Sequence, residues 1–188
     1  MPRPPTIPLL DWQAVFAAGK DHAAWLQAGE SPANQAKMEE LFQGLELDAR
    51  IRHFLAELPP IRVVAIAEDW CGDVVRHVPA LRRLASAAPK LEIRFLSREQ
   101  EPGLFTRFLT NGGEAIPKFI FLSETWVECG NWGPMPEPCR ELIARGKACG
   151  KVAAARKKVA ALYEADPGQR MVIAELVKLL DIAATNEP

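Results

Sequence analysis

The hydrophobic positions of the chain divide it into a helical first third, a central stretch of short apolar runs and a helical end. Residues 63–67 are apolar without interruption, which is typical of a strand buried on both faces and predicts a strand over 61–67. Residues 91–96 alternate apolar and charged side chains with strand periodicity, and residues 73–87 carry apolar side chains at helical spacing. Two strands joined by such a helix predict a right-handed parallel unit.

Two further strands are predicted after the glycine-rich turn at 111–113. Residues 118–122 are mostly apolar, and residues 126–130 follow a short polar turn, which indicates an antiparallel hairpin. We therefore expect one mixed four-stranded sheet, with the strands in the spatial order 91–96, 61–67, 118–122, 126–130.

The first third of the chain, residues 1–60, has the pattern of a helical extension. Asp11, Asp21 and Asp48 each precede apolar residues at helical spacing and are expected to cap helices. Ser31 is expected to cap another helix, with proline at its first position. Because the apolar stripes need a surface to cover, we expect this extension to pack on a face of the sheet.

The last third is also helical. One long helix is expected from the prolines at 134 and 136 to about Tyr163, with Cys149 on its apolar stripe, and an amphipathic helix is expected in 164–188. The chain is thus interpreted as one α/β domain over 1–188, with its core at 61–163.

Composition narrows the class of protein. The 188 residues are 48% hydrophobic and 25% charged, with a net charge of -1, so neither nucleic acid nor a membrane is indicated as a partner. No stretch approaches the length of a membrane span, and prolines interrupt residues 1–8 where a signal peptide needs an apolar core. The four cysteines have neither the spacing of a secreted disulfide framework nor that of a zinc site. We expect a cytoplasmic protein with reduced thiols and no metal.

Cys71 is the strongest candidate for chemistry, because it lies where the buried strand gives way to a helix. Unpaired backbone N–H groups and the positive end of the helix dipole favour a thiolate at such a position, while the carboxylate of Asp73 opposes it. We expect a modestly lowered pKa for the Cys71 thiol. The alternative is a small residue buried for packing.

Residues 70–72, Trp-Cys-Gly between a strand and a helix, resemble the start of the active site in the thioredoxin superfamily. Ile116-Pro117, just before an apolar strand, resembles the cis-proline loop of that family, which lies beside the active-site cysteine and offers its backbone to an extended substrate. The strings EDWCGD, LTNGGEAIPKFIFL and NWGPMP are similar to a bacterial thioredoxin-like subfamily whose members often keep only the first cysteine. The resemblance implies a thioredoxin-like fold. Thioredoxins usually begin with a strand and a helix, so the extra N-terminal helices expected over 1–60 are a departure from the family.

Two departures from the thioredoxin pattern concern the dithiol cycle. The second cysteine of the Cys-x-x-Cys motif is replaced by Val74, and the buried acid that serves many thioredoxins as a proton shuttle is replaced by Ala65. Both departures predict a site that does not run the ordinary dithiol cycle.

Several residues have an expected role. Cys71 would be the reactive thiol, and Cys139 a candidate resolving thiol. Cys129 and Trp126 are interpreted as packing residues, and His77 as a hydrogen-bonded or solvated side chain rather than a general base. The expected substrate contacts come from Trp70, Gly72, Asp73, Ile116, Pro117 and Trp132.

Three functions remain open on the sequence. The first is a monothiol redox protein in which Cys71 forms mixed disulfides with protein or small-molecule thiols, with glutathione as a candidate co-substrate and no resident cofactor. The second is a non-catalytic module that binds an extended peptide or a partner protein. The third is an iron–sulfur carrier like the monothiol glutaredoxins, and it ranks last because the chain has no late Gly-Gly-Cys-Asp segment.

Overall fold

The structure is a computed structural model that describes residue 7 and residues 9–185. Its centre is one four-stranded sheet with the strand order β2-β1-β3-β4. β1 pairs in parallel with β2 and antiparallel with β3, and β3 pairs antiparallel with β4. The predicted order and the mixed strand directions are therefore confirmed. The strands are β1 (Ile61–Ile66), β2 (Leu91–Leu96), β3 (Lys118–Leu122) and β4 (Glu128–Trp132).

The last strand is shifted by two residues from the predicted 126–130. Trp126 has a φ of 66°, a left-handed conformation outside the range of regular strands, so the turn extends further than the polar residues alone suggested. The register with β3 is also irregular between Phe121 and Leu122. As a result Trp132 is the last residue of β4, not part of the loop that follows it.

Within the described residues, four helices precede the sheet. Asp11, Asp21 and Asp48 accept backbone N–H groups as predicted, whereas the Ser31 side chain caps nothing. The Trp25 ring stacks on Phe95 of β2 at 4.6 Å between centroids, so this part of the extension packs on the sheet as expected. The helices are α1 (Trp12–Ala18), α2 (His22–Gln27), α3 (Pro32–Gly44) and α4 (Ala49–Ala56).

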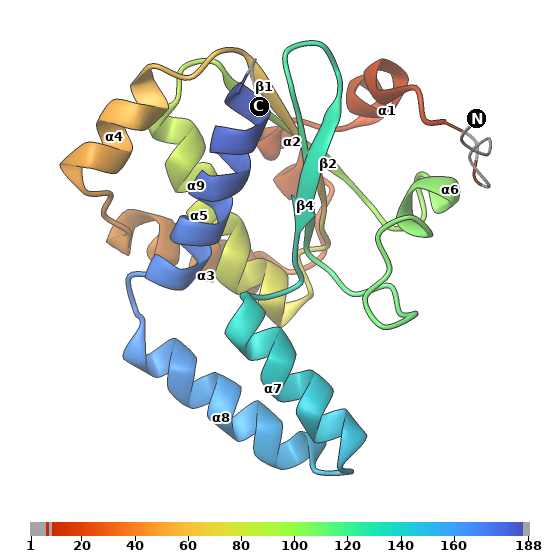
Figure 1. The fold of residues 1–188 in the computed structure, drawn as a ribbon, viewed down its shortest axis with the longest axis vertical. Coiled ribbons are helices and arrows are strands. Elements are labelled where there is room, and N and C mark those ends of the chain that lie inside the picture. The colour runs from red at the N-terminus through yellow and green to blue at the C-terminus, as the bar shows by residue number, and fades with distance from the viewer. Residues whose placement is uncertain (1–6, 8, 186–188) are drawn as a thin grey trace.

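Helices lie on both sides of the sheet. The helix α5 (Gly72–Ala87) and the final helix α9 (Arg170–Ala184) lie together on one side, and α1 and the short α6 (Pro102–Phe105) lie on the other (Figure 1). α3 and α4 pack against the outer side of α5. No helix in the described residues is long and apolar enough to cross a membrane.

The predicted long helix from 134 to 163 is wrong. The structure has two helices there, α7 (Glu137–Ala148) and α8 (Val152–Ala165), packed side by side. Gly150 makes the reversal with a φ of 71°, and Gly146 allows α8 to approach closely because a Cβ there would lie 2.6 Å from that of Ala155. Cys149 is consequently exposed at the tip of this hairpin and not on a buried stripe. The hairpin projects from the end of the molecule where α5 begins (Figure 1).

Candidate functional site

Cys71 is the N-cap residue of α5 and is partly exposed. Its Sγ lies 3.6 Å from the carbonyl oxygen of Ile116, and the Ile116–Pro117 peptide bond is cis. The strand–helix junction and the proline loop therefore meet at the thiol, as the resemblance implied. An extended chain that pairs with the backbone at Ile116 would pass directly beside Cys71.

The pKa of the Cys71 thiol is raised, so the expectation of a lowered value is wrong. Burial is the largest cause, because it removes water that would stabilise a thiolate. The backbone N–H groups of Val74 and Asp73 favour the thiolate, as does the charge of Arg98, while the Asp73 carboxylate opposes it. Desolvation therefore outweighs the helix N-terminus at this position.

Next to the thiol, the surface carries an exposed aromatic ring. Trp70 is 48% exposed, and the guanidinium of Arg98 lies 5.1 Å from its ring centroid. Gly72 is exposed as well, with open space where a side chain would be. A partner chain approaching Cys71 would find an aromatic face and an unobstructed helix start.

Gly133 completes the site on the side of the proline loop. A Cβ on Gly133 would overlap the carbonyl oxygen of Pro117, and the residue has a φ of 118° that favours glycine. The Gly133–Pro134 bond is also cis. The Gly-Pro dipeptide in NWGPMP is the signal from which this second sharp turn could have been found.

Trp132 does not flank the thiol at the surface, contrary to the expectation for that residue. It is 3% exposed and its ring stacks on Phe119 at 5.3 Å between centroids. Its Nε1 donates to Glu175 Oε2 at 2.6 Å. As the last residue of β4 it points into the core between the sheet and α9, so only its neighbour Gly133 reaches the proline loop.

Asp73 and Arg76 connect the start of α5 to the helical hairpin. Burial raises the pKa of the Asp73 carboxyl, and the charges of Arg76 and Arg156 partly offset this. Arg76 donates to the carbonyl of Tyr163 at 2.8 Å, and its guanidinium lies 4.0 Å from the Tyr163 ring centroid. The hairpin is thereby held beside the first turn of the cysteine helix.

His77 is fully buried and hydrogen-bonded, in agreement with its interpretation as something other than a general base. Its Nε2 lies 3.1 Å from the hydroxyl of Tyr163, and its ring packs edge-on against Trp132. Burial, with the charge of Arg76 as a second cause, lowers the pKa of His77 to about 3. The imidazole is therefore neutral at physiological pH.

The other cysteines lie in different environments. Cys139 has no exposed surface, and burial raises its pKa while a hydrogen bond with Tyr163 opposes this. Cys129 is partly buried at the edge of the core, and its thiol lies 3.3 Å from the carbonyl of Val127. The enclosure of Cys139 favours a packing role, since a resolving thiol needs access to the mixed disulfide. Among the described residues, no group of three or more potential metal ligands gathers.

Val74 and Ala65 occupy enclosed positions behind the thiol. Neither has exposed surface: Val74 lies in the first turn of α5, and Ala65 lies in β1 between Phe95 and Phe119. The two places that hold the second thiol and the buried acid in a dithiol site are thus filled by apolar side chains.

Asp69 is a structural residue of the site that the sequence analysis missed. It is 4% exposed, and its carboxylate accepts hydrogen bonds from the N–H groups of Glu30 and Ser31 and from Gln35 Nε2. Burial disfavours the charged form, but these hydrogen bonds outweigh it and lower the pKa of Asp69. The loop that carries Cys71 is thereby fixed to the start of α3.

Comparison with known proteins adds a family and a fold. A sequence model of the family described as Thioredoxin matches residues 19–154. A crystal structure of a protein of unknown function from Pseudomonas aeruginosa is similar with a TM-score of 0.70 at 20% identity, over 94% of this chain and 100% of that one. An HIV epitope-scaffold has a TM-score of 0.67 at 19% identity, over 93% and 100%. At these identities the structural likeness shows the fold alone. No curated protein sequence matches the chain.

Proposed function

The chain belongs to the thioredoxin family, and from this premise we propose that it is a monothiol redox protein whose Cys71 forms mixed disulfides. The proposal has two further parts: the chain is a member of a bacterial thioredoxin-like subfamily with a single motif cysteine, and the protein is cytoplasmic. The observation that carries it is the 3.6 Å approach of Cys71 Sγ to the carbonyl of Ile116, next to a cis-proline. That arrangement supports an extended substrate that pairs with the Ile116 backbone while its sulfur faces the thiol.

The proposed step is thiol–disulfide exchange. Cys71 loses its proton to solvent, and the thiolate attacks one sulfur of a disulfide, forming a new S–S bond. The old S–S bond breaks, and its electron pair leaves on the other sulfur, which takes up a proton. Release of the bound half requires a second thiol from solution or from a protein, with glutathione as a candidate, because Val74 supplies none.

The raised pKa of Cys71 predicts slow kinetics in both directions. Little thiolate is present at neutral pH, so attack is slow, and a thiol of high pKa is a poor leaving group when the mixed disulfide is attacked. The adduct on Cys71 would therefore be long-lived. Such chemistry suits capture or protection of a partner thiol better than rapid reduction of many disulfides.

The same observation favours a second candidate, a module that binds an extended peptide or a partner protein without chemistry. Trp70, 48% exposed beside Gly72, would then supply the contact surface, and Cys71 would be one polar contact among several. The two functions differ in whether Cys71 forms a bond to sulfur.

The test is incubation of the natural protein with a disulfide, followed by intact-mass measurement. A mass increase of one disulfide half, absent in Cys71→Ser and reversed by an added thiol, supports the redox function. The matched control is Cys149→Ser, which removes an exposed thiol at the hairpin tip and should keep the Cys71 adduct. No adduct on Cys71 after prolonged incubation at pH 9 would refute the redox function and leave the binding module.

A further inference from the structure

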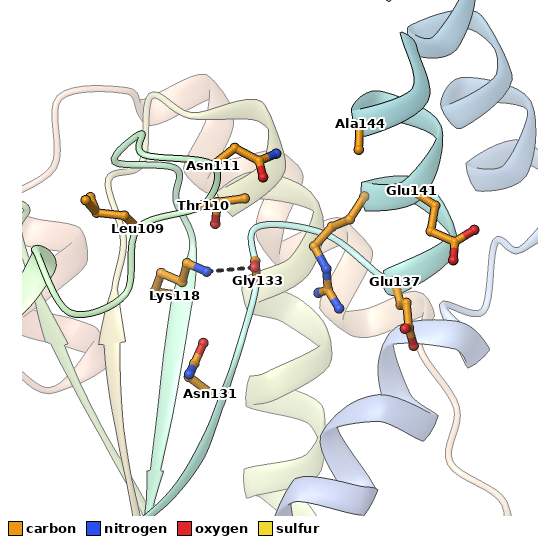
Figure 2. Close-up of a pocket in the computed structure, with 10 residues that line it drawn as sticks. Leu109, Thr110, Asn111, Lys118, Asn131, Gly133, Glu137, Glu141 and Ala144 are labelled. Carbon is orange, nitrogen blue, oxygen red and sulfur yellow. Dashed lines mark hydrogen bonds between the residues drawn. The ribbon is translucent and has the colours of Figure 1, made fainter. Parts of the chain in front are cut away.

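An open cavity of about 480 Å³ lies directly beyond the proline loop, between the loop at 109–111 and α7. Figure 2 shows Lys118 and Asn131 on the side of the strands, Thr110 and Asn111 on the loop, and Glu137 and Ala144 on the helix. None of these residues was assigned a role above. Most of the side chains that line the cavity are polar: Thr110, Asn111, Lys118, Asn131, Glu137, Arg140 and Glu141.

Two cations, Lys118 and Arg140, line this cavity. Lys118 is 5% exposed and donates one of its three ammonium hydrogens to the carbonyl of Gly133 at 2.9 Å. The pKa of Lys118 is lowered to about 8, mainly by burial and next by repulsion from the charge of Arg140. Within the described chain neither one forms an ion pair with a carboxylate. A bound anion would relieve the repulsion.

Thr110 lines the cavity as well. Thr110 Oγ1 is buried and has no hydrogen-bond partner in the described structure. A buried polar group without a partner costs free energy, which a ligand oxygen would recover. Two carboxylates also line the cavity and oppose a bound anion: Glu141 lies 3.8 Å from Arg145, which is outside the cavity, and Glu137 has no cation partner among the described pairs.

We propose that this cavity binds a carboxylate of the thiol or disulfide substrate that reacts at Cys71. The inference rests on the proposed redox function. Lys118 follows Ile116 by two residues, so their Cα atoms are at most about 7 Å apart. The substrate class is therefore an acidic thiol or an acidic peptide segment, with a carboxylate about two residues from the reacting sulfur. Arg140 and Lys118 supply the charge, and Thr110 the neutral hydrogen bond.

The experiment compares rates of adduct formation on Cys71 with two disulfides of opposite character: oxidised glutathione, which is anionic, and 2-hydroxyethyl disulfide, which is neutral. Quenched samples are measured by mass spectrometry, and the ratio of the two rate constants is the readout. Arg140→Gln is expected to lower the ratio by about three- to tenfold, as for loss of one partly buried ion pair. Lys147→Gln is the matched control, since it removes one positive charge from the same helix, and Lys147 neither lines the cavity nor forms an ion pair in the described part of the chain.

A second variant tests the neutral contact and preserves the fold. Thr110→Val removes a hydroxyl that has no partner in the described structure, so it should leave stability unchanged and still lower the ratio, by about two- to fivefold. A ratio that is unchanged in both variants, or that falls equally in Lys147→Gln, overturns the carboxylate site. If neither disulfide modifies Cys71, the proposed function has failed instead.

Discussion

The α-carbon of Gly133 lies against the carbonyl oxygen of Pro117, so closely that a Cβ on Gly133 would overlap that oxygen. This contact joins the end of β4 to the loop that faces Cys71. The neighbouring Lys118 ammonium strengthens the junction by donating to the Gly133 carbonyl. The position of Ile116, and with it the surface offered to a substrate, therefore depends on a residue distant from the cysteine in the sequence.

Gly133→Ala is expected to destabilise the protein by about 3 kcal/mol, because the new methyl group meets backbone and the φ of 118° is unfavourable for alanine. Gly112→Ala is the control: Gly112 has a φ of 75° but open space around it, so only the conformational cost of about 1 kcal/mol applies. Urea denaturation of both variants measures the difference. Equal losses would show that the contact with Pro117 is unimportant.

Asp69→Ala is expected to cost about 2–4 kcal/mol at pH 7, because two backbone N–H groups and the Gln35 amide lose their acceptor. The folded-state pKa of Asp69 is lowered, so its contribution is complete above its ordinary value of about 3.9 and disappears as the pH falls through the lower folded value. The stability gap between natural protein and variant should thus be constant from pH 5 to about pH 8 and shrink below about pH 4. A gap that is independent of pH down to unfolding would contradict the assignment.

The comparison of sequence with structure separates what local pattern determines from what it does not. The strand order and the meeting of Cys71 with Ile116 were predictable, because the apolar runs and the two motifs occur in a fixed order. The α7–α8 hairpin was not, because apolar spacing continues in phase across the break at Gly150 and no proline marks it. The available signal for the end of α7 was Gly150, just before Lys151, because a glycine often follows the last residue of a helix.

Two errors at the site have physical causes that sequence pattern does not carry. A shift of two residues leaves each side chain of β4 on the same face of the sheet, so the pattern of the strand does not reveal it. The shift nevertheless moved Trp132 from the loop into the strand, where its side chain is buried in the core. The direction of the Cys71 pKa shift depends on how much protein encloses the thiol, which only the packed loops decide.

The reactivity of the Cys71 thiol should depend on pH in a way that its surroundings determine. The rate at which iodoacetamide alkylates Cys71 should rise with pH. The midpoint of this rise should lie at a higher pH than for the same cysteine in the urea-unfolded chain, because burial disfavours the thiolate. Asp73→Asn should move the midpoint down, since it removes a repelling carboxylate. Glu141→Gln, a change of equal charge on α7, serves as the control and should leave the midpoint in place. A midpoint below that of the unfolded chain would refute this account.

Val74 decides the fate of any mixed disulfide on Cys71. The residue has no exposed surface and lies in the first turn of α5, where a second thiol would attack the adduct and release the substrate within one molecule. With valine there, the natural protein should reduce insulin-type disulfides poorly and accumulate a long-lived adduct with oxidised glutathione.

Val74→Cys would place the missing thiol within reach of Cys71, so oxidation should produce an internal 71–74 disulfide, detectable as a loss of two free thiols in the intact chain. Reductase activity should appear but remain partial, because Ala65 leaves the buried thiol without a carboxylate to take its proton and burial keeps that thiol protonated. Val74→Ser is the control: like cysteine, serine is smaller and more polar than valine, but it carries no thiol, so this variant should remain inactive. Ala65→Asp added to Val74→Cys should raise the activity further at neutral pH. If the natural protein already reduces disulfides rapidly, another cysteine must resolve the adduct, and Cys139→Ser would then be the next variant to test, despite the enclosure of Cys139.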